Sequence, residues 1–550
     1  MRTFECLWDP LSIQRLPVEL LINVFSAADC LGSWSRHGSL RGRAISQIML
    51  VCRHWHDVVC VTPIFWRCID AVEPVHTVSL FLDRSSGCTV DVRVFYSKVT
   101  CNNKERLIDR EAVLLALSQP DRVRSLYMNI SVDHTAEVLY PLLRTGFPAL
   151  EHLEIVPVNI GASNRDRIEL GLQALSQPSL RSLVVKQVCL PPPATFWRSL
   201  RVLKLYEPPE TASGPMFIQD IATILRRNAA LEELTIWHSR NPVRYGHTME
   251  SPDDPVRDVG RRLIGLPKLR LLSLHNTYAF IAELLQYLVL PQDIPYTDIR
   301  CYSPAQQYEH ALSTLFPPHC LFLLERMSAV SFMDRSSSTV HLCSPPNAPV
   351  DPDVSPEVTS IAFVASQGNV VEEGVSYNLR CLTTVLGWIP VRRLVLNDLP
   401  VPKGIDTYER VFDSIPSLEE LVICVLSMQH DVLTALTPQT DEDDGHRLDI
   451  PRCPQLRALS VYVLEGYSRT AQQVVKALDM CLKARADADV PLEELNISVS
   501  DRLWVEELTR ETEGATAELL LSIKDAVPTF HYRKFGQKHY YVYEWRVCRP

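Results

Sequence analysis

The chain has no apolar run long enough to cross a lipid bilayer. Its longest largely apolar stretch lies around Leu284 to Leu290 and is itself interrupted by Gln286, whereas a transmembrane helix needs about 20 predominantly apolar residues. The first ten residues, MRTFECLWDP, also have no apolar run of signal-peptide length. We therefore expect an intracellular protein, cytoplasmic, nuclear or both, with no membrane association.

The chain also has no excess of positive charge. It contains 55 Lys and Arg against 65 Asp and Glu, which gives a formal net charge of −10 and a pI near 5.9. Binding to nucleic acid along the whole chain requires a basic surface. The acidic balance therefore counts against nucleic acid and favours protein partners.

Motifs for metal binding and catalysis are absent as well. The 16 cysteines include no Cys-x-x-Cys pair, so we predict neither a zinc site nor a tight disulfide framework, and most cysteines are expected to be reduced and buried. No glycine-rich phosphate loop, His-Glu-x-x-His or Gly-x-Ser-x-Gly occurs. Cys52, His54 and His56 are close in sequence, but residues two apart on a helix point away from each other. We predict a non-enzymatic protein without cofactor or metal.

The region 16–69 has the pattern of a small helical module. Pro17 suits a first helical turn and Glu19 suits the positive end of the helix dipole, so a helix is expected to begin at Leu16 or Pro17. Apolar residues then recur at helical spacing in two stripes, Leu16, Leu20, Leu21, Val24, Phe25 and Ile45, Ile48, Met49, Cys52, Trp55, Val59. A turn at Thr62 and Pro63 follows, and then the large rings of Phe65 and Trp66. Together these features predict a compact module of three helices.

These residues resemble a known family. Leu-Pro-x-Glu-Leu-Leu-x-x-Val-Phe, Val-Cys-Arg-x-Trp and Thr-Pro-x-x-Trp are similar to the F-box, through which substrate receptors dock on the Skp-type adaptor of SCF ubiquitin ligases. The loop from Asp29 to Arg43 is longer than in the family pattern. The resemblance does not predict how this loop affects docking on the adaptor. The resemblance implies that the adaptor contacts the motif positions Leu16, Pro17, Leu20, Leu21, Val24, Phe25, Val51, Cys52 and Trp55.

A six-residue phrase recurs after this module: apolar, two variable residues, apolar, one variable, apolar. Nine clear copies begin at Leu150, Leu180, Leu200, Leu231, Leu269, Val391, Leu418, Leu456 and Leu492. Weaker copies span Val75 to Leu80, Val123 to Met128, Met327 to Phe332, Val358 to Phe363 and Val527 to Tyr532. The phrase is typical of the strand in a leucine-rich repeat, in which each unit buries its leucines by stacking on its neighbours.

Amphipathic stretches between the phrases predict helices. They are Thr135 to Leu143, Asp166 to Leu175, Phe217 to Arg227, Val256 to Ile264, Ile281 to Leu288, Tyr408 to Ser414, Thr470 to Ala484 and Val505 to Asp525. Alternating strands and helices predict an α/β chain with a parallel sheet. We expect a tail (1–15), the F-box (16–69), an irregular leucine-rich-repeat solenoid with concave strands and convex helices (70–526), and a capping strand or hairpin (527–550). This organisation resembles divergent F-box and leucine-rich-repeat proteins abundant in fungi.

Period-two alternation identifies candidate target-binding residues. If the apolar phrase positions point inward, the residues between and after them point to the other face of the sheet. Aromatic side chains on a polar face are frequent binding anchors, and four residues meet this description: Tyr206, Trp237, His275 and Tyr462.

The C-terminal stretch from His531 to Trp545 interleaves basic and aromatic residues. Such a pattern can bind single-stranded nucleic acid by stacking. Alternation of Tyr541, Tyr543 and Trp545 after a turn at Gly536 favours a capping hairpin instead.

The sequence thus favours a substrate receptor of an SCF-type ubiquitin ligase. Its F-box would dock on the Skp-type adaptor and cullin assembly, and its repeats would bind a target protein of unknown identity. A repeat scaffold that recruits no ligase is the alternative, and nucleic-acid binding through the tail is the third possibility.

Overall fold

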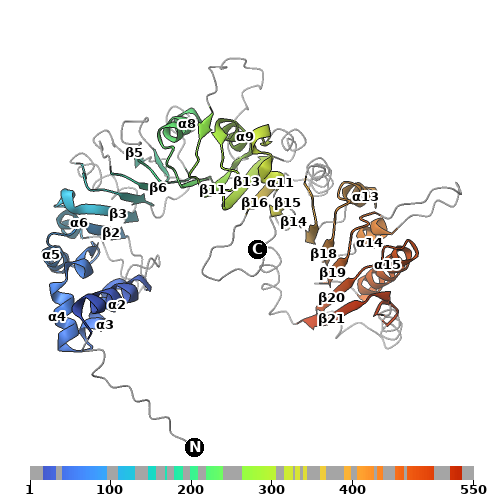
Figure 1. Cartoon of the computed structure of the whole chain (residues 1–550), viewed down its shortest axis with the longest axis horizontal. Coiled ribbons are helices and arrows are strands. Elements are labelled where there is room, and N and C mark those ends of the chain that lie inside the picture. The colour runs from blue at the N-terminus through green and yellow to red at the C-terminus, as the bar shows by residue number, and fades with distance from the viewer. Residues whose placement is uncertain are drawn as a thin grey trace, which may run out of the picture. The chain divides into compact units, whose positions relative to one another are not determined.

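The computed structural model divides the chain into two compact units, Met1–Leu231 and Glu232–Pro550, which are described separately (Figure 1). The division falls inside the region 70–526 that was expected as one repeat array. The structure describes residues 16–31, 40–95, 109–129, 146–156, 168–169, 179–189, 199–207, 218–238, 263–304, 315–325, 327, 329–334, 338–343, 359–366, 389–397, 405–425, 430–437, 452–463, 468–500, 521–524 and 526–535.

Unit 1 begins with three helices, followed by a 3₁₀ turn. These are α2 (Val18–Leu31), α3 (Leu40–Met49), α4 (Arg53–Val61) and η1 (Pro63–Trp66). The second apolar stripe of the sequence spans both α3 and α4, because the chain is extended at Cys52, whose Sγ accepts the N–H of Trp55 at 3.5 Å and caps α4. Helices α2 and α3 also extend into the expected loop insert, and residues 32–39 lie outside the described part.

A ladder of parallel strands follows in unit 1. In spatial order its strands are β1 (Cys68–Asp70), β2 (Val90–Phe95), β3 (Val123–Asn129), β4 (His152–Ile155), β6 (Ser182–Lys186) and β8 (Val202–Tyr206). The other elements are α5 (Val75–Arg84), α6 (Arg110–Ala116), η2 (Pro120–Arg122), α8 (Ile218–Arg227) and the parallel pair β5 (Ile168–Glu169) and β7 (Val188–Cys189).

One weak repeat phrase was wrongly predicted. Val75 to Leu80 belongs to helix α5, which starts directly after Pro74. Val78 and Leu82, four residues apart, are buried, whereas Leu80, the last position of the supposed strand phrase, is exposed. The spacing of Val75 and Val78 fits a helix as well as the phrase, and Pro74 at the helix start decides between them.

Unit 2 contains eleven strands in one ladder within its described residues. In spatial order they are β9 (Glu233–Trp237), β11 (Leu271–Thr277), β13 (Tyr296–Pro304), β16 (Thr359–Ser366), β15 (Ser338–Cys343), β14 (Ala329–Asp334), β17 (Arg393–Asn397), β18 (Glu420–Val425), β19 (Ala458–Val463), β20 (Glu494–Ser500) and β21 (Thr529–Phe535). All pairs are parallel except those of β15, which is antiparallel to both of its neighbours. An antiparallel strand therefore interrupts the expected parallel order.

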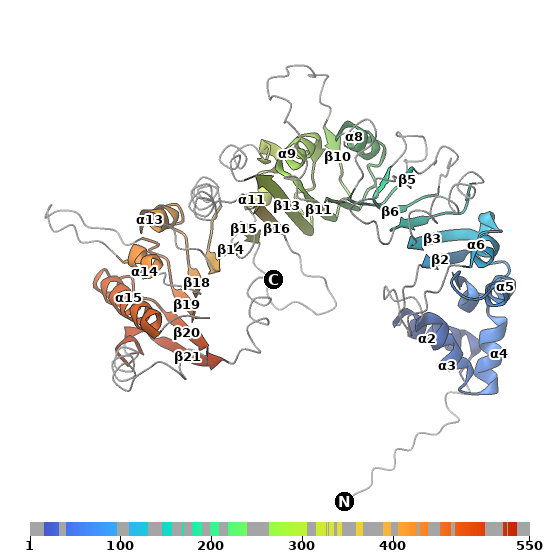
Figure 2. The ribbon, with the colours of Figure 1, turned by 180° about the vertical axis from the view of Figure 1, so that it is seen from behind.

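The helices and short elements of unit 2 lie between these strands in the sequence. They are α9 (Tyr278–Tyr287), η6 (Pro318–Cys320), α11 (Phe322–Glu325), α13 (Ile405–Asp413), α14 (His430–Leu436), α15 (Ser468–Asp487) and the parallel pair β10 (Ile264–Gly265) and β12 (Leu288–Val289). Helices α13, α14 and α15 lie along one side of strands β18 to β21 in both views (Figure 2).

The nine clear phrases all form strands, and they share one register. In each, the strand begins at the third position, and neighbouring phrases pair third position to third position, as His152 pairs with Ser182 and Ser182 with Val202. All apolar phrase positions are at most 3% exposed. The leucines therefore stack in aligned layers from strand to strand, as the repeat pattern predicts.

The weaker phrases and the helices had mixed outcomes. The phrases at Val123, Met327, Val358 and Val527 form β3, β14, β16 and β21. The helices expected at Phe217, Ile281, Tyr408 and Thr470 match α8, α9, α13 and α15 within a few residues. The helix expected from Asp166 is contradicted at Ile168–Glu169, a short strand, and the helix from Val256 at Ile264. The helices at Thr135 and Val505 lie outside the described residues, apart from a helical stretch at 521–524.

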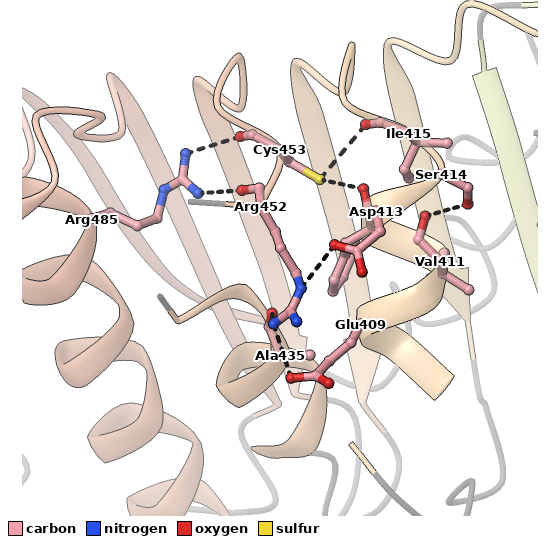
Figure 3. Close-up of polar contacts among 10 residues, drawn as sticks. Glu409, Val411, Asp413, Ser414, Ile415, Ala435, Arg452, Cys453 and Arg485 are labelled. Carbon is pink, nitrogen blue, oxygen red and sulfur yellow. Dashed lines mark hydrogen bonds and ion pairs between the residues drawn. The ribbon is translucent and has the colours of Figure 1, made fainter. Parts of the chain in front are cut away.

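A buried arginine holds the turn between α14 and β19. Arg485 of α15 is fully buried, and its guanidinium donates to the carbonyl oxygens of Arg452 at 3.0 Å and Cys453 at 3.2 Å (Figure 3). It also donates to the carbonyl oxygen of Leu456 at 3.4 Å. Cys453 has a positive φ of 49°, a strained conformation for a residue with a side chain. Burial lowers the pKa of Arg485 from its ordinary value. The donors of Arg485 thus offset the strain of the turn they enclose.

Arg452 ties the same turn to two helices. Its Nε donates to Asp413 and its Nη1 to Glu409, both at 2.9 Å, and Nη1 also donates to the Ala435 carbonyl at 3.2 Å. The contacts join α13, α14 and the approach to β19 (Figure 3).

Candidate functional site

The N-terminal module is organised around a compact aromatic core. Phe25 of α2 lies 4.7 Å from the ring of Trp55 and 6.1 Å from that of Phe65, measured between centroids. Leu21, Phe25, Phe65 and Trp66 are buried, and the indole N–H of Trp66 donates to the Val59 carbonyl at 2.8 Å. These contacts fix the three helices and the 3₁₀ turn relative to one another.

Several apolar side chains of this module remain exposed. On α2, Leu20 and Val24 are each 49% exposed, and Pro17 lies in the turn before them. Residues four apart share one helix face. At the junction of α3 and α4, Leu50 is 84% exposed and Val51 59% exposed. We call these five residues the exposed apolar set.

The predicted adaptor-binding positions therefore fall into three groups. Pro17, Leu20, Val24 and Val51 belong to the exposed apolar set. Leu21 and Phe25 are at most 1% exposed and build the core instead, so they offer no surface to a partner. Leu16, Cys52 and Trp55 are half-buried and line the boundary between the two.

Leu50 was missed by the sequence reasoning. It lies in the middle of the second apolar stripe, between Met49 at the end of α3 and Val51, and period analysis alone assigns it no face. Its exposure follows from the break of the helix after Met49, where the N–H of Leu50 bonds to the carbonyl of Ser46 at 3.2 Å.

The module is packed directly onto the strands that follow it in unit 1. Phe81 of α5 meets Trp66 edge to face at 5.0 Å between centroids, and the Arg84 guanidinium lies 4.3 Å from the Trp66 ring centroid. The Nη1 of Arg84 also donates to the Sγ of Cys60 at 3.4 Å. Helix α5 thereby joins the aromatic core to β1, the first strand of the ladder.

A second candidate surface lies on unit 2. Trp237 of β9 and His275 of β11, both predicted as binding anchors, are paired in register, and their rings meet edge to face at 5.6 Å. Trp237 is 41% exposed and His275 is 8% exposed. The structure therefore brings two of the four predicted target-binding residues together.

An acidic and a basic residue of β13 complete this surface, and sequence reasoning did not find them. Asp298 Oδ2 lies 2.8 Å from Nε2 of His275, and Asp298 Oδ1 lies 3.4 Å from Nε of Arg300. Burial raises the pKa of Asp298, but the hydrogen bond from His275, with its charge and that of Arg300, leaves the pKa below its ordinary value. An ionised carboxylate only accepts, so the His275 ring donates from Nε2.

The other two predicted anchors lie elsewhere. Tyr206 ends strand β8 in unit 1 and is half-buried. Tyr462 of β19 is also half-buried and is paired with Cys424 and Ser498. Seven strands of the unit 2 ladder, from β11 to β18, lie between Trp237 on β9 and Tyr462 on β19, so the four residues do not form one site.

The remaining sequence candidates are placed as follows. Cys52 caps α4, and His56 follows on the same helix, bonded to Asp57 at 3.2 Å. Within the described residues, no three His, Cys, Asp or Glu side chains converge as metal ligands, and no helix is long and apolar enough to cross a bilayer. The tail beyond Phe535, with Tyr541 and Trp545, lies outside the described residues.

Comparison with known proteins supports the F-box resemblance. Residues 13–71 match the family model described as F-box-like. No curated protein matches the chain. Among solved structures, it is similar to the crystal structure of a TLR13–ssRNA13 complex, with 11% identity and a TM-score of 0.21; the match covers 81% of this chain and 46% of that one. A likeness this weak carries no argument about fold or function.

Proposed function

We propose that this protein is the substrate-recognition subunit of an SCF-type ubiquitin ligase. The F-box-like match at residues 13–71 carries the proposal. F-box domains are protein-interaction modules that bind Skp-type adaptors, and the exposed apolar set supplies surface of the kind such an interface buries.

The strand ladders would hold the target. We interpret the nine aligned phrases as a divergent leucine-rich-repeat solenoid, because their buried positions stack in one register over two series of strands. Parallel strands present a row of side chains on the face away from the core, and such a surface can bind a protein segment.

The protein would act by proximity and would make no covalent bond itself. Docking through the N-terminal module places the target near a ubiquitin carrier, which converts a bimolecular encounter into a local one. The packing of Trp66 against Phe81 and Arg84 supports this role, because it fixes the docking module to the first strands.

Co-expression with a Skp-type adaptor tests the docking step. Leu50→Asp combined with Val51→Asp places two charges among exposed apolar side chains, and we expect the adaptor to be lost from the purified complex. Leu114→Asp is the matched control, because Leu114 is an exposed leucine on α6, outside the module. Equal recovery of adaptor with the double variant would contradict the docking surface.

Wild-type protein that recruits no adaptor would instead favour the alternative, a repeat scaffold without a ligase. Capture of cellular proteins by the double variant separates the two roles further. Since Leu50 and Val51 lie far along the chain from the unit 2 strands, we expect the variant to retain its targets while their ubiquitination stops.

A further inference from the structure

Three side chains form a row across neighbouring strands of unit 2. Trp237, His275 and Arg300 occupy matching register positions on β9, β11 and β13. Neighbouring strands are about 4.8 Å apart, so the backbones of Trp237 and Arg300 are separated by about 10 Å.

Asp298 fixes the basic end of this row. It lies two residues before Arg300, hence on the same face of β13, and it engages Nε of Arg300 and Nε2 of His275. Within the described residues, the side chain of Arg300 donates to Asp298, and this hydrogen bond uses only the Nε of Arg300. The side chain of Arg300 is 46% exposed, so its two terminal amino groups present a positioned fork to solvent.

The charge of the row is therefore complementary to an anion. The Asp298 carboxylate is only 10% exposed and already shared between two donors. Glu233 lies on the same face of β9, but four residues before Trp237, which is about 13 Å along the strand. An incoming carboxylate or phosphate would meet the guanidinium first, and Arg binds both groups through paired N–H donors.

We propose that this row binds an extended protein segment in which an anionic side chain follows an apolar one at a distance of three residues. The apolar side chain packs on Trp237, and the anion pairs with Arg300. A polyproline II segment rises about 3.1 Å per residue with three residues per turn, so residues three apart face the same way at about 9.3 Å. This matches the separation of the two ends of the row.

The inference rests on the proposed function, in that the segment would belong to the target. The anion can be an Asp or Glu carboxylate or the phosphate of a modified serine, since both offer two oxygens to the fork. Aromatic surfaces accept proline-rich extended segments because these lose little conformational entropy on binding.

Fluorescence anisotropy with short proline-rich labelled peptides and the full chain tests the proposal. One peptide carries Leu and Glu three residues apart, a second has phosphoserine in place of Glu, a third has Gln there, and a fourth places Leu and Glu adjacent. We expect the first or second peptide to bind, and the Gln and adjacent peptides to bind about tenfold more weakly or worse.

Variants of the row supply the second half of the test. Arg300→Ala and Trp237→Ala are each expected to weaken the anionic peptide about tenfold. Arg392→Ala, which removes an arginine 67% exposed before β17, should leave affinity unchanged. Thermal unfolding of all three variants reports whether the fold is kept.

The outcomes separate the two proposals. Stronger binding of the phosphoserine peptide identifies a modified target, and stronger binding of the Glu peptide an unmodified acidic one. Equal binding of the Gln peptide, no binding of any peptide, or full affinity in folded Arg300→Ala would overturn the site. Adaptor recovery is measured on the same samples, so loss of peptide binding with adaptor retained contradicts this inference alone.

Discussion

The exposed apolar set gives a quantitative prediction for adaptor docking. Four of its members can be shortened to alanine, singly and together: Leu20, Val24, Leu50 and Val51. Each already buries part of its surface in the folded chain, so only the exposed remainder can contribute to binding. That remainder is about half of Leu20, Val24 and Val51, and most of Leu50.

The expected magnitude follows from these fractions. Burying a whole Leu or Val side chain is worth about 1.5–3 kcal/mol. At the lower end of this range, the exposed half of Leu20, Val24 or Val51 contributes about 0.8 kcal/mol each, and the exposed part of Leu50 about 1.5 kcal/mol. The sum is about 4 kcal/mol, which predicts a roughly thousandfold larger dissociation constant for the adaptor complex of the fourfold variant.

Calorimetric titration of purified chain with the adaptor measures this loss. Because the contacts are apolar, the difference between wild type and variant should change little with salt concentration. Leu21→Ala provides the contrast. Leu21 is fully buried, so its truncation costs about 2–5 kcal/mol of folding stability. It would weaken docking only by lowering the folded fraction of the module.

Two results would refute the reasoning. If the fourfold variant binds within a factor of two of wild type, these side chains do not meet the adaptor. If its loss of affinity matches a loss of thermal stability, the residues act through the fold and not through contact.

Three further predictions concern the rest of the chain. Arg485→Met removes three hydrogen bonds to backbone carbonyls and should destabilise unit 2 by about 2 kcal/mol in chemical denaturation. Arg457→Met, at an exposed ion pair, should change stability by less than about 0.5 kcal/mol. Equal effects of the two variants would contradict a stabilising role of the Arg485 hydrogen bonds. The pKa of Asp298 is lowered in the folded chain, so its stabilising contribution is complete above the unfolded pKa of about 3.9 and is lost as pH falls through the lower folded pKa. The difference in free energy of unfolding between wild type and Asp298→Asn should therefore disappear in acid. A difference that stays the same down to acid unfolding would contradict the lowered pKa. Val78→Asp places a charge on the buried face of helix α5 and should prevent stable folding, whereas Leu80→Asp should be tolerated. Stable folding of Val78→Asp with loss of folding in Leu80→Asp would favour a strand at Val75 to Leu80.

The strand phrases could be predicted because the spacing of their apolar residues identifies which side chains are buried. Each places apolar residues at positions one, four and six, and a strand start at position three brings positions four and six to one face. Val75 to Leu80 satisfied the same pattern and became a helix, since positions one and four also fit helical spacing. A single phrase is therefore ambiguous, and the repetition over nine aligned strands is what makes the other predictions secure.

The strand order of unit 2 could not be predicted in the same way. Strand β14 pairs with β17, and β16 pairs with β13, because the antiparallel strand β15 between them reverses the spatial order of this segment. The phrases at Met327 and Val358 predict strands but say nothing about their neighbours. Pairing depends on long-range contacts that a local pattern does not contain.

The same limit explains which part of the unit 2 surface was found. Alternation after a phrase identified Trp237 and His275, each one residue beyond the last apolar position of a clear copy. Asp298 and Arg300 belong to β13, whose sequence contains no copy, so no rule assigned them a face. Only the pairing of β13 with β11 brings the carboxylate to His275. The aromatic half of the row is thus encoded locally, whereas its charged half depends on the assembled sheet, and the peptide with both an apolar and an anionic residue tests whether the two halves act together.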